Sequence, residues 1–109
     1  MSVQSKLLTL STALVSIPGL SVGHYRNYMQ TDDYCVWAED TEANSVHGNN
    51  IKENQVIQGT IDLYTKTEFS PFVDAIQNAI NIAEIAWRIN SVQYEDETGY
   101  IHYEWIFEV

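Results

Sequence analysis

The chain has 109 residues, of which 45% are hydrophobic, a length and composition that suit one domain with a single core and exclude disorder. Fifteen Asp and Glu residues against five Lys and Arg give a net charge of −10, which argues against sequence-specific nucleic-acid binding because such binding relies on basic side chains. Two uses of this acidity remain, namely imitation of nucleic acid and the lining of a passage through which DNA slides without binding.

The first segment, Ser2 to Ser16, is predicted to be an amphipathic helix that ends before Pro18-Gly19. Its apolar residues repeat at intervals of four and three, the spacing of one helix face: Val3, Leu7, Leu10, Leu14 and Ile17. The segment faintly resembles a secretory signal, but Ser and Thr side chains interrupt its apolar stretch, so we expect a retained helix. No stretch of the sequence is long enough and apolar enough to cross a membrane.

Two strands and a long loop are predicted next. Ser21 to Met29 and Tyr34 to Glu39 form the strands, and the second contains the single cysteine, Cys35. A lone cysteine in a strand is expected to be a small buried hydrophobe, and it excludes an internal disulfide. Asp40 to Asn54 has no periodicity and is predicted to be a polar loop; loops of this length usually have a function or become ordered on binding.

The second half of the chain contains the clearest patterns. Gln55 to Thr67 alternates between apolar and polar residues and is predicted to be a strand with a bulge or a close neighbour at Gly59. Ser70 and Pro71 begin a second helix that runs to about Ile80, with Ser70 as N-cap. Trp87 to Val109 is predicted to be a hairpin that turns at residues 96–99 and buries alternate residues of its second strand.

This order predicts a single α+β domain over residues 1–109, with the element order α-β-β-β-α-β-β. We expect a two-layer sandwich in which a mostly antiparallel sheet of four to five strands has both helices on one face. The opposite face would remain partly aromatic and exposed, as a subunit interface does. The candidates for this interface are Tyr64, Tyr94, Tyr100 and Ile106.

The sequence shows no catalytic or cofactor motif, and we expect a protein that is not an enzyme and that needs no metal or cofactor. His102 is predicted to be a structural hydrogen-bond partner. The acidic side chains of one region lack the spacing of a calcium loop and are interpreted as a surface patch. This patch consists of Asp32, Asp33, Glu39, Asp40 and Glu42.

Three segments together resemble the small tail terminator and tail completion proteins of long-tailed bacteriophages. They are YMQTDDYCVWAED (28–40), VIQGTIDLYTKTEFSPFVDAIQNAI (56–80) and WRINSVQYEDETGYIHYEWIFEV (87–109), and they cover more than half of the chain. The resemblance implies a homo-oligomeric ring, commonly a hexamer, that caps the tail tube protein and joins it to the head connector protein. Genomic DNA would pass through the ring without specific binding, and the protein would reside in the virion after assembly in the bacterial cytoplasm.

Within this interpretation, the long loop would reach a neighbouring subunit or the tube through Asn44, Asn49 and Asn50. The acidic patch would face the lumen of the ring or a basic partner. Two alternatives remain open at this point. One is an acidic inhibitor that imitates DNA, and the other is a small ligand-binding α+β domain, which would need a pocket with convergent polar groups.

Overall fold

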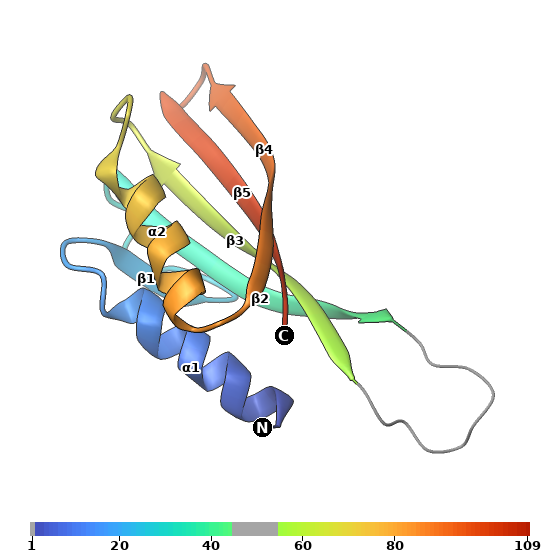
Figure 1. The fold of residues 1–109 in the computed structure, drawn as a ribbon. Coiled ribbons are helices and arrows are strands. Elements are labelled where there is room, and N and C mark those ends of the chain that lie inside the picture. The colour runs from blue at the N-terminus through green and yellow to red at the C-terminus, as the bar shows by residue number, and fades with distance from the viewer. Residues whose placement is uncertain (1, 45–54) are drawn as a thin grey trace.

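The computed structural model describes residues 2–44 and 55–109 and has the predicted element order. Its elements are α1 (Val3–Val15), β1 (Ser21–His24), β2 (Asp33–Asn44), β3 (Val56–Thr65), α2 (Pro71–Ile82), β4 (Ala86–Glu95) and β5 (Tyr100–Glu108). The five strands form one sheet in the order β1-β2-β3-β5-β4, and the two helices cover one face of it (Figure 1). The prediction of an α+β two-layer sandwich is therefore confirmed.

The predicted helix starts and periodicities are confirmed. Ser2 caps α1, and its side chain accepts a hydrogen bond from the backbone N–H of Ser5. Ser70 caps α2 in the same way through Phe72, with proline in the first turn. These hydroxyls satisfy backbone donors that a helix leaves unpaired at its start, which is why short polar residues mark both N-termini.

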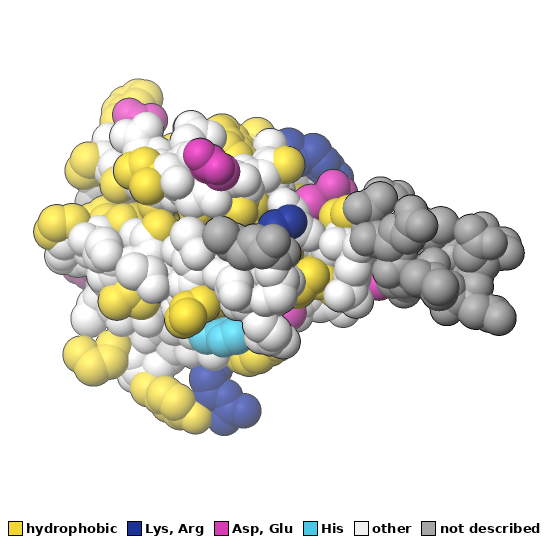
Figure 2. Space-filling model, turned by 60° about the horizontal axis from the view of Figure 1, so that its bottom comes forward, with side chains coloured by type: hydrophobic (Ala, Val, Ile, Leu, Met, Phe, Trp, Pro, Cys, Tyr) yellow, Lys and Arg dark blue, Asp and Glu magenta, His cyan; other side chains and the backbone are white. Residues whose placement is uncertain are grey.

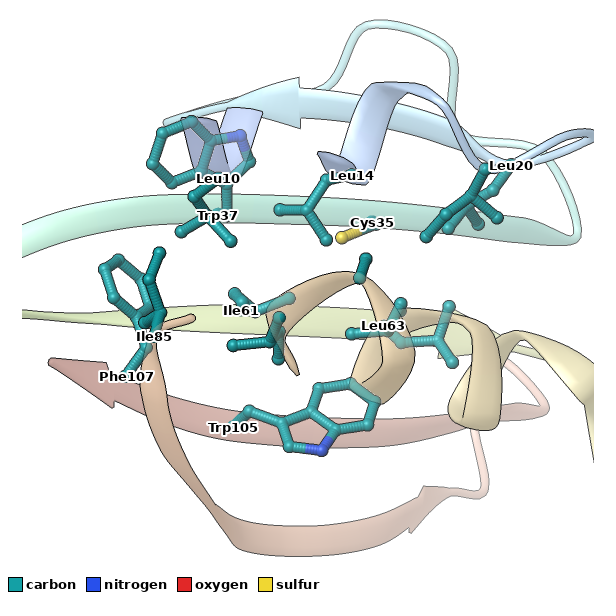
Figure 3. Close-up of a cluster of buried hydrophobic side chains, with 14 of the residues drawn as sticks. Leu10, Leu14, Leu20, Cys35, Trp37, Ile61, Leu63, Ile85, Trp105 and Phe107 are labelled. Carbon is teal, nitrogen blue, oxygen red and sulfur yellow. The ribbon is translucent and has the colours of Figure 1, made fainter. Parts of the chain in front are cut away.

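The core lies between the helices and the sheet (Figure 3). Leu10 and Leu14 of α1 point toward the sheet, and Trp37, Ile61 and Phe107 point back toward the helices. Cys35 is fully buried among them, as predicted, and its burial raises the pKa of its thiol well above the ordinary value. The predicted alternation in the last strand is confirmed, because Trp105, Phe107 and Val109 are buried.

The first strand differs from the prediction. It ends at His24 instead of Met29 and runs parallel to β2, whereas the other strand pairs are antiparallel. The chain leaves the sheet at Tyr25, which has a φ of 67°, and folds back over Gly23 so closely that a Cβ there would lie 2.1 Å from the carbonyl oxygen of Arg26. The Asn27 amide then donates to the carbonyl oxygens of Ser21 and Cys35, at 3.1 Å each. The chain therefore runs back along β1 before β2 begins. The two strands start side by side and run in the same direction.

The second strand is longer than predicted. It continues to Asn44, so residues 40–44 belong to the strand and not to the predicted loop, and Thr41, Glu42 and Asn44 pair with β3. Asp40 is an extra residue in this pairing, because Glu39 lies opposite Gly59 and Thr41 lies opposite Gln58. Such bulges obscure the alternation from which strands are recognised in a sequence. The remainder of the predicted loop, residues 45–54, lies outside the described residues.

Candidate interaction surfaces

The sheet face away from the helices, which we call the outer face, is acidic. Strand register places Asp62 opposite Glu104 and leaves Glu95 and Glu108 on the same face. Among the described residues, these four carboxylates are accompanied by only two basic side chains, Arg88 within the face and Lys66 at its margin. Among the described residues, the outer face therefore has a net negative charge.

An aromatic cluster occupies one end of the outer face. The Tyr64 ring stacks on Tyr34 at a centroid distance of 4.7 Å and on His102 at 4.2 Å, and Tyr100 meets both tyrosines edge-on. Burial, reinforced by the nearby Asp62 carboxylate, raises the pKa of Tyr64 to about 12. The Tyr100 hydroxyl donates to the carbonyl oxygen of Thr31 at 2.7 Å. Tyr64 and Tyr100 therefore already make contacts within their own chain, and only the rest of their surface is available to a partner.

His102 has the structural role that was predicted for it. Its Nε2 lies 2.8 Å from Oδ1 of Asp62, and its Nδ1 lies 3.7 Å from Oε2 of Glu95. Burial raises the pKa of Asp62, and the hydrogen bond with His102 opposes that increase. The imidazole therefore lies between two carboxylates, one on β3 and one on β4, and is hydrogen-bonded to that of Asp62.

One predicted interface residue lies on the wrong face. Tyr94 pairs with Ile101 and therefore lies on the helix side of the sheet, opposite to Tyr64, Tyr100 and Ile106. The reason is the register of the hairpin, in which a four-residue turn pairs Glu95 with Tyr100. The sequence alone would have assigned Tyr94 to the correct face if the residue pairs of the hairpin had been counted outward from the turn, because Tyr94 then pairs with Ile101.

The predicted acidic patch is divided by the structure. Asp33 and Glu42 are near opposite ends of β2, about 30 Å apart at the usual rise per strand residue. Asp33 accepts a hydrogen bond from the Thr65 hydroxyl at 2.5 Å, and Asp32 lies 3.8 Å from the Lys66 ammonium. In the second half of the strand, Glu39 pairs with His24, Asp40 is the bulge residue and Glu42 accepts a hydrogen bond from Gln55. These five acids therefore form two groups, and the outer face holds four further carboxylates, Asp62, Glu95, Glu104 and Glu108.

The Glu39 carboxylate is held in its charged form. Its Oε1 lies 2.6 Å from Nε2 of His24, whose ring stacks between Tyr25 and Trp37. Burial alone raises the pKa of Glu39, but the hydrogen bond with His24, together with further hydrogen bonds, outweighs burial and lowers the pKa below its ordinary value. This pair ties the end of β1 to the middle of β2.

Of the predicted loop contacts, Asn44 is the last residue of β2, paired with Val56. Asn49 and Asn50 lie outside the described residues.

Apart from Tyr94, sequence reasoning missed the residues of an apolar row on β4. Ile89, Val92 and Tyr94 lie on the helix side of this edge strand, yet they are 45%, 53% and 64% exposed because α2 does not extend over them. Phe69, in the loop before α2, is 95% exposed and adopts a φ of 56°, which is unfavourable for a bulky residue. We call Ile89, Val92 and Tyr94 the β4 row.

A groove between the two helices was also missed. It has a volume of about 650 Å³ and opens on the side of the helices away from the sheet. Figure 2, seen from the side of α1, shows exposed hydrophobic side chains in several groups with few charged side chains between them. The residues that form this helix groove include Leu8, Thr12 and Ala13 of α1 and Ala75, Ala79 and Ile82 of α2. Its lining does not supply the convergent polar groups that a small polar ligand would need.

Comparisons with known proteins do not assign this chain to a family. No family model matches it, and no curated protein is significantly similar to it. Within the described residues, no helix has the length and hydrophobicity needed to span a membrane. The same residues contain no group of three or more His, Cys, Asp or Glu side chains arranged to hold a metal ion.

Proposed function

We propose that this chain is a structural tail-assembly protein of a long-tailed bacteriophage. It forms a homo-oligomeric ring, a hexamer in the arrangement implied by the sequence resemblance, that caps the tail tube and joins it to the head connector. It acts without catalysis, and DNA passes through the ring. Its place of action is the tail or neck of the virion, which assembles in the bacterial cytoplasm.

The acidic outer face is the observation that best supports this proposal. DNA carries one negative charge per about 1.7 Å of duplex, so a basic lumen would retain it and an acidic lumen repels it. Two of the outer-face carboxylates lie beside a neutral donor or a histidine: Asn90 donates to Glu104 at 2.7 Å, and His102 lies beside Asp62. Arg88 lies near Glu108, and four carboxylates against Arg88 and Lys66 leave the face with a net negative charge.

The exposed apolar surfaces support assembly into a ring. A monomeric protein rarely exposes apolar patches larger than a few hundred Å², and larger patches mark contacts with other molecules. The β4 row and the helix groove are two different surfaces of one chain. Two unlike surfaces are what a head-to-tail ring needs, because every subunit then uses both.

The first test of the function is imaging combined with a capping assay. The protein, mixed with a cognate tail tube protein, should form rings with a central hole at tube ends and stop tube growth. Tubes that elongate without limit at saturating protein would contradict the proposal.

A charge-reversal variant tests the lumen. Glu104→Lys combined with Glu108→Lys changes the charge of the outer face and should leave ring formation intact while slowing DNA ejection through the tail. The matched control is Asp96→Lys combined with Glu97→Lys, which makes the same charge change in the exposed turn between β4 and β5. Equal rates of DNA ejection for both variants would contradict the proposal that the outer face lines the lumen of the ring.

The acidic outer face also favours a second candidate function, an inhibitor that imitates DNA. Four carboxylates on one sheet face could occupy the phosphate sites of a basic DNA-binding enzyme. In that case, the protein would inhibit a nuclease as a monomer, and Glu104→Lys with Glu108→Lys would abolish the inhibition. A ring at tube ends, without inhibition of nucleases, would decide for tail assembly.

A further inference from the structure

The α2 helix lies between α1 and β4 (Figure 1), and an apolar surface lies on each of these two sides. The helix groove separates α2 from α1 on one side, and the β4 row lies beyond α2 on the other side. We propose that the β4 row of one copy of this chain packs into the helix groove of a second copy. This inference rests on the proposed ring function and specifies the contact between its subunits.

The groove suits an apolar occupant because its hydroxyl groups are already satisfied. Thr9, Thr12 and Ser16 line it, and each hydroxyl donates to a carbonyl oxygen four residues earlier in α1, at 2.9, 3.0 and 2.7 Å. The small side chains of Ala75 and Ala79 on α2 leave room between the helices. An aliphatic or aromatic side chain therefore enters this groove without leaving these three hydroxyl groups unpaired. The exposed side-chain amide of Asn78 also lines the groove.

The β4 row provides side chains of the required kind. The α2 helix covers the strand only near its start, where the Trp87 indole donates to Asn81 at 2.7 Å and the neighbouring Trp105 donates to Gln77. Beyond that point, Ile89, Val92 and Tyr94 stay exposed although they face the helix side.

The exposed area of the row is large enough to matter for a stable contact. At roughly 200 Å² for an aromatic side chain, Tyr94, which is 64% exposed, presents about 130 Å². Ile89 and Val92 add to this area. A standard interface buries about 800 Å² on each partner, so the row supplies an apolar part of one.

The absence of charge on the two surfaces allows a second copy of the chain to be the occupant. The chain has a net charge of −10, so two copies repel each other over most orientations. The groove lining and the three side chains of the β4 row are uncharged, and Lys66 and Glu68 lie beside the row at Tyr94. Because the two surfaces differ, each subunit offers its row to one neighbour and its groove to the next.

Cysteine cross-linking tests this contact even if it is transient in solution. Chains with Val92→Cys in the row are mixed with chains with Ile82→Cys at the groove and oxidised with diamide. Cys35 gives little background because it is fully buried. The control replaces Ile82→Cys by Val15→Cys, which is 62% exposed on α1 and does not line the groove.

We expect Val92→Cys and Ile82→Cys chains to form a mixed disulfide at least tenfold faster than Val92→Cys and Val15→Cys chains. Rates equal to this control, or a faster link between two Val92→Cys chains, would overturn the inference. A tube that is capped normally by a Val92→Glu chain would also overturn it, while leaving the proposed function intact.

A chain that carries both Val92→Cys and Ile82→Cys separates the contact from the ring. Oxidation should give a ladder of trimers and larger species up to a closed ring. A product that stops at dimers, with both disulfides formed between two chains, would support the contact and contradict the ring function.

Discussion

Gly59 of β3 lies where the structure leaves no space for a side chain. A Cβ added there would lie 2.2 Å from the carbonyl oxygen of Ala38, 2.8 Å from Cα of Glu39 and 2.5 Å from Cζ of Phe107. Favourable contacts between carbon atoms are about 3.5–4.0 Å, and two of these three obstacles are backbone atoms of the paired strand β2. The Gly59→Ala variant must therefore push β2 away from β3 next to the bulge at Asp40.

Overpacking of this kind typically costs about 1–3 kcal/mol. We expect the upper end, about 3 kcal/mol, because a backbone obstacle cannot rotate away as a side chain can. For a domain of about this size, each 1 kcal/mol lowers the melting temperature by roughly 4–8 °C, so Gly59→Ala should melt roughly 12–24 °C below the parent.

Urea unfolding followed by circular dichroism measures this loss, and Gly99→Ala is the matched control. Gly99 has a φ of 78° but no atom within 4 Å of an added Cβ, so Gly99→Ala should cost only about 1–2 kcal/mol through backbone strain. A Gly59→Ala variant as stable as Gly99→Ala would refute the steric argument and with it the close approach of β2 to β3.

Three further predictions concern single side chains. The pKa of Glu39 is lowered in the folded state, so its carboxylate stabilises the protein above pH 4.5. Glu39→Gln should therefore lower the free energy of unfolding at pH 7, and this loss of stability should fade as pH falls through the folded-state pKa. For Asp62 the pH effect has the opposite sign. Its pKa is raised in the folded state, so the ionised carboxylate opposes folding and Asp62→Asn should gain stability at neutral pH. This gain in stability, measured by urea titration at several pH values, should disappear as pH falls toward 3.8. A Glu39→Gln penalty that is constant from pH 7 to pH 3, or an Asp62→Asn advantage that grows in acid, would contradict these signs. Ser70→Ala removes the N-cap of α2 and should cost about 1 kcal/mol in urea unfolding, whereas no loss would mean that the cap is not formed.

Local patterns were sufficient to predict most elements. The four-three spacing of Leu7, Leu10 and Leu14 identified the buried side of α1, and the Ser70-Pro71 pair located the start of α2. The alternation in β3 and β5 identified their buried residues. These predictions hold because burial on one face of a helix or strand imposes a period of 3.6 or 2 on the sequence.

Predictions failed where the outcome depended on another part of the chain. The fold-back over Gly23 shortened β1, and pairing with β3 lengthened β2. The two groups of acids on β2 are close in sequence, but an extended strand separates Asp33 from Glu42 by about 30 Å.

The sequence by itself determined the class of the fold, the single domain, the excess of negative charge and the residues of the core. Those properties depend on composition and on local periodicity. Only the tertiary structure decided which surfaces are available for contact. The helix groove exists because two helices distant in sequence lie side by side, and Tyr94 is exposed because α2 ends its cover of β4 before reaching it. Register, strand order and helix placement are set by packing between distant segments, and no local pattern records them.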